Sequence, residues 1–133
     1  MEKTKTIKQR VTFSSTPQEL YTILIDSKKH SDLTGDVAKI SKKVGGKFSV
    51  YGGYASGKNL EIVPGKKIVQ SWRASDWPKD SFSTVTFEFK PATSGTQLYF
   101  TQTDIPEPFY KDIRQGWIDF YWTPMKKYLK TSQ

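Results

Sequence analysis

The segment from residue 109 to residue 130 constrains the fold of this chain most strongly. At about 100° per residue, its apolar side chains gather on one broad side of a helix: Ile113, Trp117, Ile118, Phe120, Tyr121, Pro124, Met125, Tyr128 and Leu129. An apolar arc this wide predicts a helix held in the concave face of a bent sheet. Trp117 and Phe120 are expected to anchor the core. Pro124 is expected to kink the helix, because its ring displaces the Phe120 carbonyl.

Most of the remaining chain has the pattern of short strands. Residues 7 to 13 alternate apolar and polar side chains, as in a strand with one buried face. Turn residues such as Gly52-Gly53 and Pro64-Gly65 separate five later segments, which are residues 47–51, 54–63, 66–74, 81–90 and 97–103. We therefore expect six antiparallel strands, with sequence neighbours joined as hairpins.

Two short helices are expected after the first strand. Thr16, Pro17 and Glu19 supply a capping residue, a first-turn proline and a capping-box acid. A helix should therefore run from Pro17 to about residue 26, and a second from residue 28 to 33, before Gly35. The predicted order is strand, two helices, five strands and a long helix, an α+β fold. No linker or repeat interrupts it, so residues 1–133 are expected to form one domain.

The residue types argue against an enzyme. The chain has no cysteine, which excludes disulfides, thiolate nucleophiles and cysteine-containing zinc sites. His30 is the single histidine and lies in a polar stretch, so we expect it at a solvent-facing helix end. The carboxylates form no convincing acid/base pair. No catalytic residue, metal site or cofactor is predicted.

The net charge of +8 allows an anionic partner or a solvated basic surface. Lysines are scattered, arginines number three, and no nucleic-acid motif is present, so nucleic acid is not expected as a partner. No segment approaches the roughly 20 apolar residues of a membrane span. A soluble cytoplasmic protein is expected, whose partner is a small ligand or an acidic protein.

Several short motifs occur in a specific order over nearly the whole chain: Val44-Gly45-Gly46-Lys47-Phe48, Gly52-Gly53, residues 57–64, Ile68-Val69-Gln70-Ser71-Trp72-Arg73, Asp76-Trp77-Pro78, Ser83-Thr84-Val85-Thr86, Gly95-Thr96, Ile105-Pro106, Gly116-Trp117 and Tyr121-Trp122. As a set they resemble the C-terminal domain of the activators of the 90-kDa heat shock protein ATPase. That family is a branch of the START and birch-pollen-allergen-like superfamily. The resemblance implies a helix-grip fold, in which a curved six-stranded antiparallel sheet wraps around the long C-terminal helix.

The resemblance also implies that a small apolar ligand binds between sheet and helix. The residues expected to line such a cavity are Gln70, Trp72, Val85, Phe87, Phe100, Gln102, Trp117 and Tyr121. Gln9, Gln70 and Gln102 fall on inward-facing strand positions, where an unbonded glutamine costs about 1 to 3 kcal/mol. Either a partly wet cavity surrounds them or they lie at strand ends near solvent.

The second implied function is contact with the chaperone or a similar acidic partner. The loop residues Trp77, Pro78 and Lys79 are the predicted surface for that contact. The alternative is that Trp77 packs over the sheet edge, because its large ring needs burial. Full activators of this family also have an N-terminal domain that engages the chaperone, so this chain alone is not expected to stimulate the ATPase. The sequence names neither the ligand nor the oligomeric state.

Overall fold

The computed structural model describes residues 3–131, and within them seven antiparallel strands form one curved, open sheet. The spatial order is β1-β7-β6-β5-β4-β3-β2. The strands are β1 Thr4–Phe13, β2 Lys39–Ile40, β3 Lys47–Val50, β4 Ala55–Val63, β5 Lys67–Ala74, β6 Ser83–Ala92 and β7 Gly95–Pro106. The predicted count of six was wrong because β2, which pairs with β3, is too short for a detectable alternation.

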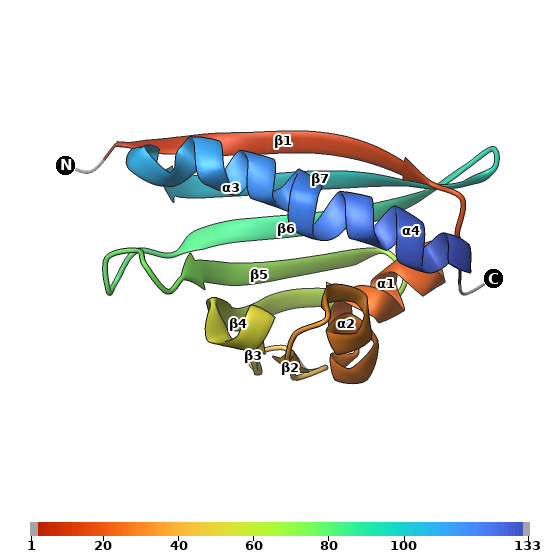
Figure 1. The fold of residues 1–133 in the computed structure, drawn as a ribbon, viewed down its shortest axis with the longest axis horizontal. Helices are drawn as coiled ribbons and strands as arrows, with labels where there is room; N and C mark the ends of the chain where they lie inside the picture. Colours follow the sequence, from red (N-terminus) through yellow and green to blue (C-terminus); the bar gives the residue numbers. More distant parts are fainter. Residues whose placement is uncertain (1–2, 132–133) are drawn as a thin grey trace.

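Two short helices follow β1, as predicted, and lie at one end of the sheet (Figure 1). In α1, Pro17–Ile25, the capping box is formed: the Glu19 N–H donates to Thr16 Oγ1 (3.2 Å), and the Thr16 N–H donates to Glu19 Oε1 (2.9 Å). In α2, Ser27–Thr34, Gly35 caps the end with φ of 74°, a left-handed conformation that glycine adopts without a steric penalty.

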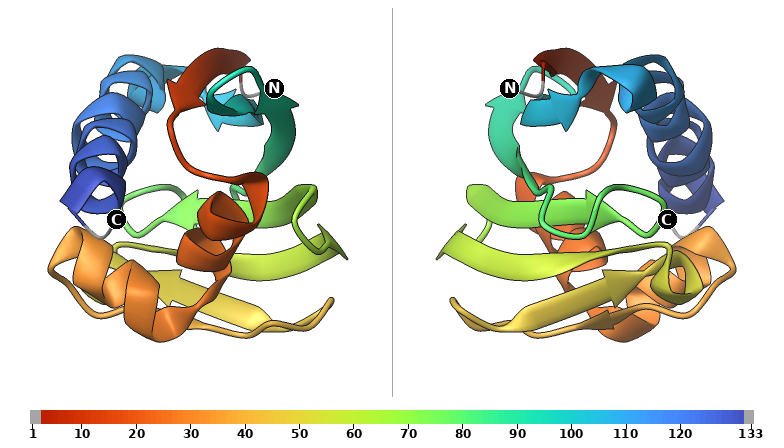
Figure 2. Two further views of the ribbon diagram at one scale, coloured as in Figure 1. Left: turned by 90° about the vertical axis from the view of Figure 1, so that its right-hand side faces the viewer. Right: turned by 90° about the vertical axis from the view of Figure 1, so that its left-hand side faces the viewer.

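The C-terminal helix crosses the concave face of the sheet (Figures 1 and 2). It consists of a short turn η2, Glu107–Phe109, then α3, Tyr110–Trp117, a π-helical segment η3, Ile118–Trp122, and α4, Thr123–Thr131. In η3 the Thr123 N–H donates to the Ile118 carbonyl, five residues back. Pro124 has no N–H for the Phe120 carbonyl, so the π-turn falls where the α-helical hydrogen bonding is interrupted.

The π-turn changes which aromatic side chains face the sheet. Phe120, expected as a core anchor, is 57% exposed, whereas Trp122 is 3% exposed. Each residue of a π-turn rotates the chain about the helix axis by a smaller angle than a residue of an α-helix does. The buried positions predicted at 100° per residue are therefore displaced from this point on. Trp117 is buried as predicted, with its ring centroid 4.4 Å from that of Phe100 and 5.6 Å from that of Trp122.

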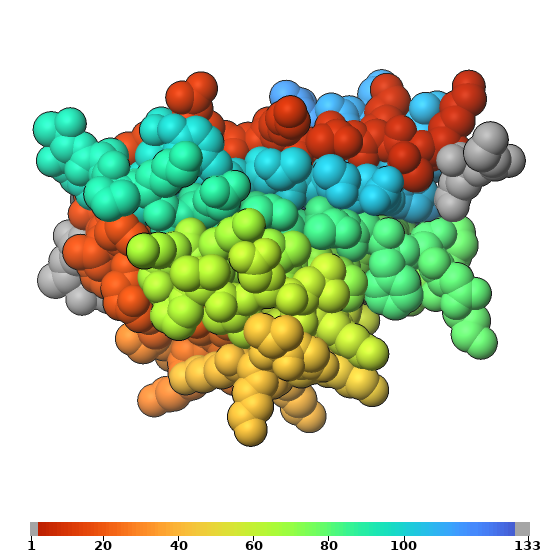
Figure 3. Space-filling view, turned by 180° about the vertical axis from the view of Figure 1, so that it is seen from behind, coloured from red at the N-terminus to blue at the C-terminus, as the bar shows by residue number. Residues whose placement is uncertain are grey.

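The outer face of the sheet carries the alternate side chains of the strands (Figure 3). The burial pattern of β5 alternates strictly between half-buried and buried positions, and β6 and β7 do so over most of their length. The inward residues therefore form the core with the helix, and the outward residues remain accessible. In the part of the chain that the structure describes, no helix is long and apolar enough to cross a membrane.

Candidate functional site: an aromatic pocket beside the C-terminal helix

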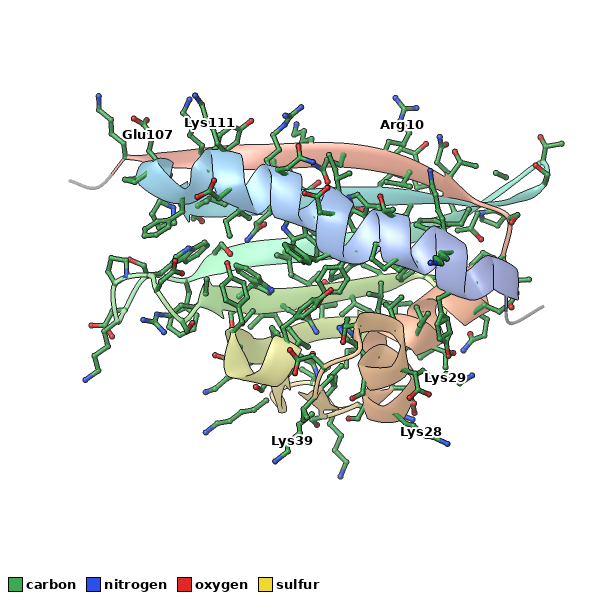
Figure 4. The ribbon with its side chains drawn as sticks, in the orientation of Figure 1. Arg10, Lys28, Lys29, Lys39, Glu107 and Lys111 are labelled. Carbon is green, nitrogen blue, oxygen red and sulfur yellow. The ribbon has the colours of Figure 1, made fainter. Side chains whose placement is uncertain are left out.

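A pocket of about 440 Å³ opens between the C-terminal helix and the β3–β5 part of the sheet. Figure 4 shows the side chains that the helix and the strands direct toward one another. From the helix the lining residues are Asp112, Ile113, Gly116, Trp117, Phe120 and Tyr121. From the other side they are Asp36, Val50, Tyr51, Tyr54, Ala55 and Trp72. The walls are thus mainly aromatic, with two carboxylates.

Small residues leave the pocket open. Gly116 lies on α3. Apart from its chain neighbours and the backbone of its own helix, a Cβ atom placed there would meet only Phe120 Cδ2, at 3.7 Å. Ala55 on β4 is buried and offers one methyl group where its neighbours offer rings. The space therefore exists because two small side chains stand among large, rigid ones that cannot collapse into it.

Tyr51 connects the sheet to the helix at this pocket. It lies in the turn η1, Tyr51–Gly53, with a left-handed φ of 52°, which is strained for a residue with a large side chain. Its hydroxyl donates to the Phe120 carbonyl, the group that Pro124 leaves without an α-helical donor. Burial, and then the nearby Asp36 carboxylate, raise the pKa of Tyr51 to about 12, so this phenol stays protonated.

Below the pocket, Tyr121 is hydrogen-bonded to His30, which is buried. The expectation of a solvent-facing histidine was wrong, because α2 turns this side chain toward the helix. Nδ1 of His30 lies 3.4 Å from the Leu24 carbonyl, which can only accept, so Nε2 accepts from the Tyr121 hydroxyl (2.9 Å). Burial lowers the pKa of His30 to about 4, and the ring is neutral at pH 7.

The eight residues predicted to line a cavity do not all surround this pocket. Trp72, Trp117 and Tyr121 line it. Gln70 and Phe87 join those three deeper inside, around a space of about 10 Å³, which is at most room for one water molecule. Val85, Phe100 and Gln102 are buried in the core and are not among the lining residues of either space. The core beneath the helix is filled, and the opening lies to one side.

Gln102 binds other protein groups. Its Oε1 accepts from Trp117 Nε1–H (2.7 Å), and its Nε2 donates to Ser83 Oγ (2.8 Å). The Ser83 hydroxyl in turn donates to the Trp72 carbonyl (2.8 Å). This chain of bonds joins β5, β6, β7 and α3, so Gln102 fixes the Trp117 indole at the pocket wall instead of facing a ligand.

The other two inward glutamines are also bonded within the protein. Gln70 Nε2 donates to Asn59 Oδ1 (3.0 Å), between adjacent strands. Gln9 accepts from Trp122 Nε1–H (2.6 Å) and donates to the Arg114 carbonyl (3.2 Å), between β1 and the helix. Neither a wet cavity nor a strand end is needed to explain the buried Gln70 and Gln102. Protein partners replace the water that these amides lose.

Of the two alternatives for Trp77, a partner surface or packing over the sheet edge, the structure shows the packing. Its side chain is 3% exposed, and its ring packs against those of Trp72 and Phe109, with centroids 5.4 and 6.0 Å away. The loop is held over them by Arg73, whose guanidinium donates to the carbonyls of Trp77 and Pro78. Only Pro78 and Lys79 of the three predicted contact residues are exposed.

A curved antiparallel sheet that holds a long C-terminal helix, with two short helices at one end, defines the helix-grip class of α+β proteins. Within this class the chain belongs to the family described as "Activator of Hsp90 ATPase homolog 1-like protein", whose model matches residues 14–130. The resemblance read from the sequence motifs is thereby confirmed.

Relatives of known name agree with this family. The chain is 34% identical over 116 residues to the human activator of 90 kDa heat shock protein ATPase homolog 1, a match that covers 87% of this chain and 34% of that protein. It is 36% identical over 118 residues to the homolog from Dictyostelium discoideum, covering 86% and 30%. The chain therefore spans about a third of the length of these relatives.

Solved structures share the fold over most of the chain. The crystal structure of an Hsp90 activator from Plasmodium falciparum superposes with a TM-score of 0.86 at 28% identity, covering 96% of both chains. The solution structure of the Aha1 dimer from Colwellia psychrerythraea gives 0.78 at 19% identity, covering 92% of this chain and 93% of that one. At 19% identity, this second likeness shows a shared fold alone.

Proposed function

We propose that this chain is a non-enzymatic binding module whose pocket takes a small apolar ligand. The observation that carries the proposal is the pocket itself, about 440 Å³ with walls of aromatic side chains. Small-molecule sites typically measure roughly 300 to 1,000 Å³ and combine an apolar lining with a few polar groups. Burial of an apolar ligand against these rings would supply the binding free energy.

The tyrosines and the histidine at the pocket support binding instead of proton transfer. Tyr51 and Tyr121 have raised pKa values and keep their protons at neutral pH. His30 is neutral, and both ring nitrogens face hydrogen-bonding partners within the protein. A general base near pH 7 needs a free lone pair that faces the substrate, which these three groups do not offer.

A cavity-filling variant tests the proposal. Gly116→Leu would place a side chain in the pocket, and it improves helix propensity, so the protein should remain folded. Gln115→Leu, on the exposed side of the same helix, is the matched control. We expect saturable fluorescence enhancement of N-phenyl-1-naphthylamine with the wild type and Gln115→Leu, and its loss with Gly116→Leu. Dye binding that is absent from the wild type, or unchanged by Gly116→Leu, would contradict the proposal.

A second candidate function is contact with an acidic protein, for which the family points to the 90-kDa heat shock protein. One observation favours it: Lys47 and Lys58 stand directly opposite each other on β3 and β4, both exposed. Like charges in this position repel. Among the described side chains neither ammonium group forms a salt bridge. Lys39, on the neighbouring β2, projects outward at the same edge (Figure 4).

Charge reversal tests this contact. Lys47→Glu should weaken binding to a purified 90-kDa heat shock protein, because it removes one of the two adjacent positive charges that would attract an acidic surface. Calorimetry at low and high salt measures the affinity and its dependence on screening. Lys111→Glu makes the same charge change at the far edge of the molecule and is the control (Figure 4). Equal affinities for both variants would exclude this edge as the contact surface.

A further inference from the structure

We infer that the ligand of the aromatic pocket is a small apolar molecule that carries a positive charge, such as an alkyl or aromatic ammonium. The inference rests on the proposed pocket function and adds the charge of the ligand to it. Three features of the pocket support it: the sign of its charged groups, the number of aromatic rings in its walls and the hydrogen-bond donors that are already used.

The charged groups of the pocket have the opposite sign to the chain as a whole. The chain has 21 Lys and Arg against 13 Asp and Glu. Among the described residues that line the pocket, however, Asp36 and Asp112 are the only ones that are charged at neutral pH, and both are negative. Neither forms a salt bridge with another described side chain. A basic protein therefore has two carboxylates without a salt bridge at this aromatic opening, one of which, Asp36, accepts a hydrogen bond from the Val37 N–H (2.9 Å).

The two carboxylates come from separate elements and act on the pocket. Asp36, between α2 and β2, reaches Gly52, where an added Cβ would lie 2.9 Å from its Oδ1. Asp112 is in the first turn of α3. Burial is the larger cause of the raised pKa values of Tyr51 and Tyr54, but Asp36 contributes at Tyr51, and Asp76 and Asp112 contribute at Tyr54. The negative potential thus extends to the phenols of the wall.

The rings of the wall also favour a cation. Tyr51, Tyr54, Trp72, Trp117, Phe120 and Tyr121 line the pocket. The face of an aromatic ring is negative, and cations over tryptophan or tyrosine faces are bound more strongly as water is excluded. Lining by several such rings is the arrangement that recognises quaternary ammonium groups.

An anion would find few donors here. The Tyr51 hydroxyl already donates to the Phe120 carbonyl, and the Trp117 N–H to Gln102. The Tyr121 hydroxyl donates to His30. A carboxylate or phosphate in the pocket would lose its hydration and face two like charges, with only the Tyr54 hydroxyl and the Trp72 N–H left among the lining side chains as donors. The same chemistry therefore disfavours fatty acids, although these are the usual apolar probes.

Three probes that have an alkyl chain of the same length but differ in the charge of the head group test the inference: octyltrimethylammonium, octanol and octanoate. Dissociation constants follow from tryptophan fluorescence, since Trp72 and Trp117 line the pocket. We expect the cation to bind about tenfold more tightly than octanol, the sum of cation–π and partly screened carboxylate contributions. Non-specific adsorption to a chain of net charge +8 would instead favour octanoate.

Isosteric variants assign the preference to the carboxylates. The double variant Asp36→Asn/Asp112→Asn should reduce the preference for the cation over octanol by about threefold or more, leaving the cation–π part. Asp119→Asn, on the same helix but not lining the pocket, should leave it unchanged. Circular dichroism of each variant checks that the fold persists.

The outcomes separate the two proposals. If octanol or octanoate binds as tightly as the cation, and Gly116→Leu abolishes that binding, the pocket function stands and the charge inference is overturned. If no probe binds saturably, the pocket function fails and the inference with it. A cation preference that survives both Gly116→Leu and the double variant would place binding elsewhere and overturn the inference.

Discussion

At the residue scale, Tyr51 shows how a local strain is compensated by a distant contact. Its left-handed conformation is unfavourable for tyrosine, and its hydroxyl bonds to a carbonyl 69 residues away in the sequence. The rings of Tyr51 and Tyr121 also lie edge to face, with centroids 5.6 Å apart. The hydrogen bond and the ring contact together offset the strain, and they hold one wall of the pocket against the other.

Removing the Tyr51 hydroxyl tests this compensation. Tyr51→Phe keeps the ring but leaves the Phe120 carbonyl without its donor, and should lower the free energy of unfolding by about 1 kcal/mol. Urea denaturation gives the value. Tyr99→Phe, which loses a hydrogen bond to Gln97 two residues away on the same strand, should cost less, because that bond joins no separate elements and offsets no backbone strain. Equal small losses in both would show that the Tyr51 bond does not fasten the pocket.

His30 predicts a pH dependence of stability. Its folded pKa of about 4 lies below the ordinary histidine pKa of 6.5, because burial disfavours the charged ring. Between these values the unfolded chain binds the proton and the folded chain does not, so stability falls as the pH drops from about 6.5 toward 4. The loss is about 3 kcal/mol if the whole shift is realised. Denaturant melts at several pH values measure it.

The control for this pH dependence is His30→Gln. A glutamine does not titrate but can still reach the Tyr121 hydroxyl, so the variant should show a flatter stability profile between pH 6.5 and 4 than the wild type. Because Asp26 and Glu19 have lowered pKa values from backbone hydrogen bonds to Lys29 and Thr16, respectively, an acid-side loss from these carboxylates remains in both proteins. Identical profiles would mean that His30 is not the titrating group.

At the element scale, the π-turn η3 decides which face of the helix enters the core. Its position follows from Pro124, which the sequence shows, but its effect on the neighbouring rings does not follow from an α-helical periodicity. A prediction at 100° per residue placed Phe120 inside and did not single out Trp122 as a core residue. The structure reverses the two.

A pair of alanine variants tests this register. Trp122→Ala should lower the free energy of unfolding by about 3 to 5 kcal/mol, because the ring is buried against Phe100 and Trp117. Phe120→Ala should cost less than about 1 kcal/mol, because the ring is largely exposed. The two melts are compared under one condition. A larger loss for Phe120→Ala than for Trp122→Ala would contradict the described register.

At the scale of the whole molecule, the sheet and the helix are joined by buried polar groups as well as by aromatic packing. Gln102, Ser83 and Trp117 connect three strands to α3 through hydrogen bonds of 2.7 and 2.8 Å. Gln9 makes a similar connection from β1 to the Arg114 carbonyl in α3 and to the Trp122 N–H in η3. Such bonds fix the position of the helix more narrowly than apolar contacts, because an unmade bond in the core is costly.

Gln102→Leu tests the importance of this connection. The change leaves the Trp117 N–H and the Ser83 hydroxyl without their partner, so the free energy of unfolding should fall by about 2 to 4 kcal/mol despite the gain in apolar surface. Gln97→Leu, at a half-buried site on the same strand, is the control and should be nearly neutral. A neutral Gln102→Leu would mean that aromatic packing alone positions the helix.

The amino-acid sequence by itself determined the element order except for β2, the capping box at Thr16 and Glu19, the end of α2 at Gly35 and the seat of the C-terminal helix in a bent sheet. These depend on local periodicity, turn residues and a wide apolar arc, all of which act between near neighbours in the chain. The tertiary structure alone decided the burial of Trp77 and His30 and the opening beside Gly116. The size of a pocket between two elements depends on the volumes of side chains that come from distant segments of the chain. Whether a residue is buried depends on which other segments pack over it. The family motifs predicted a pocket between sheet and helix. Only the packing showed that the space deep beneath the helix is nearly filled and that Asp36 and Asp112 line the open pocket beside it.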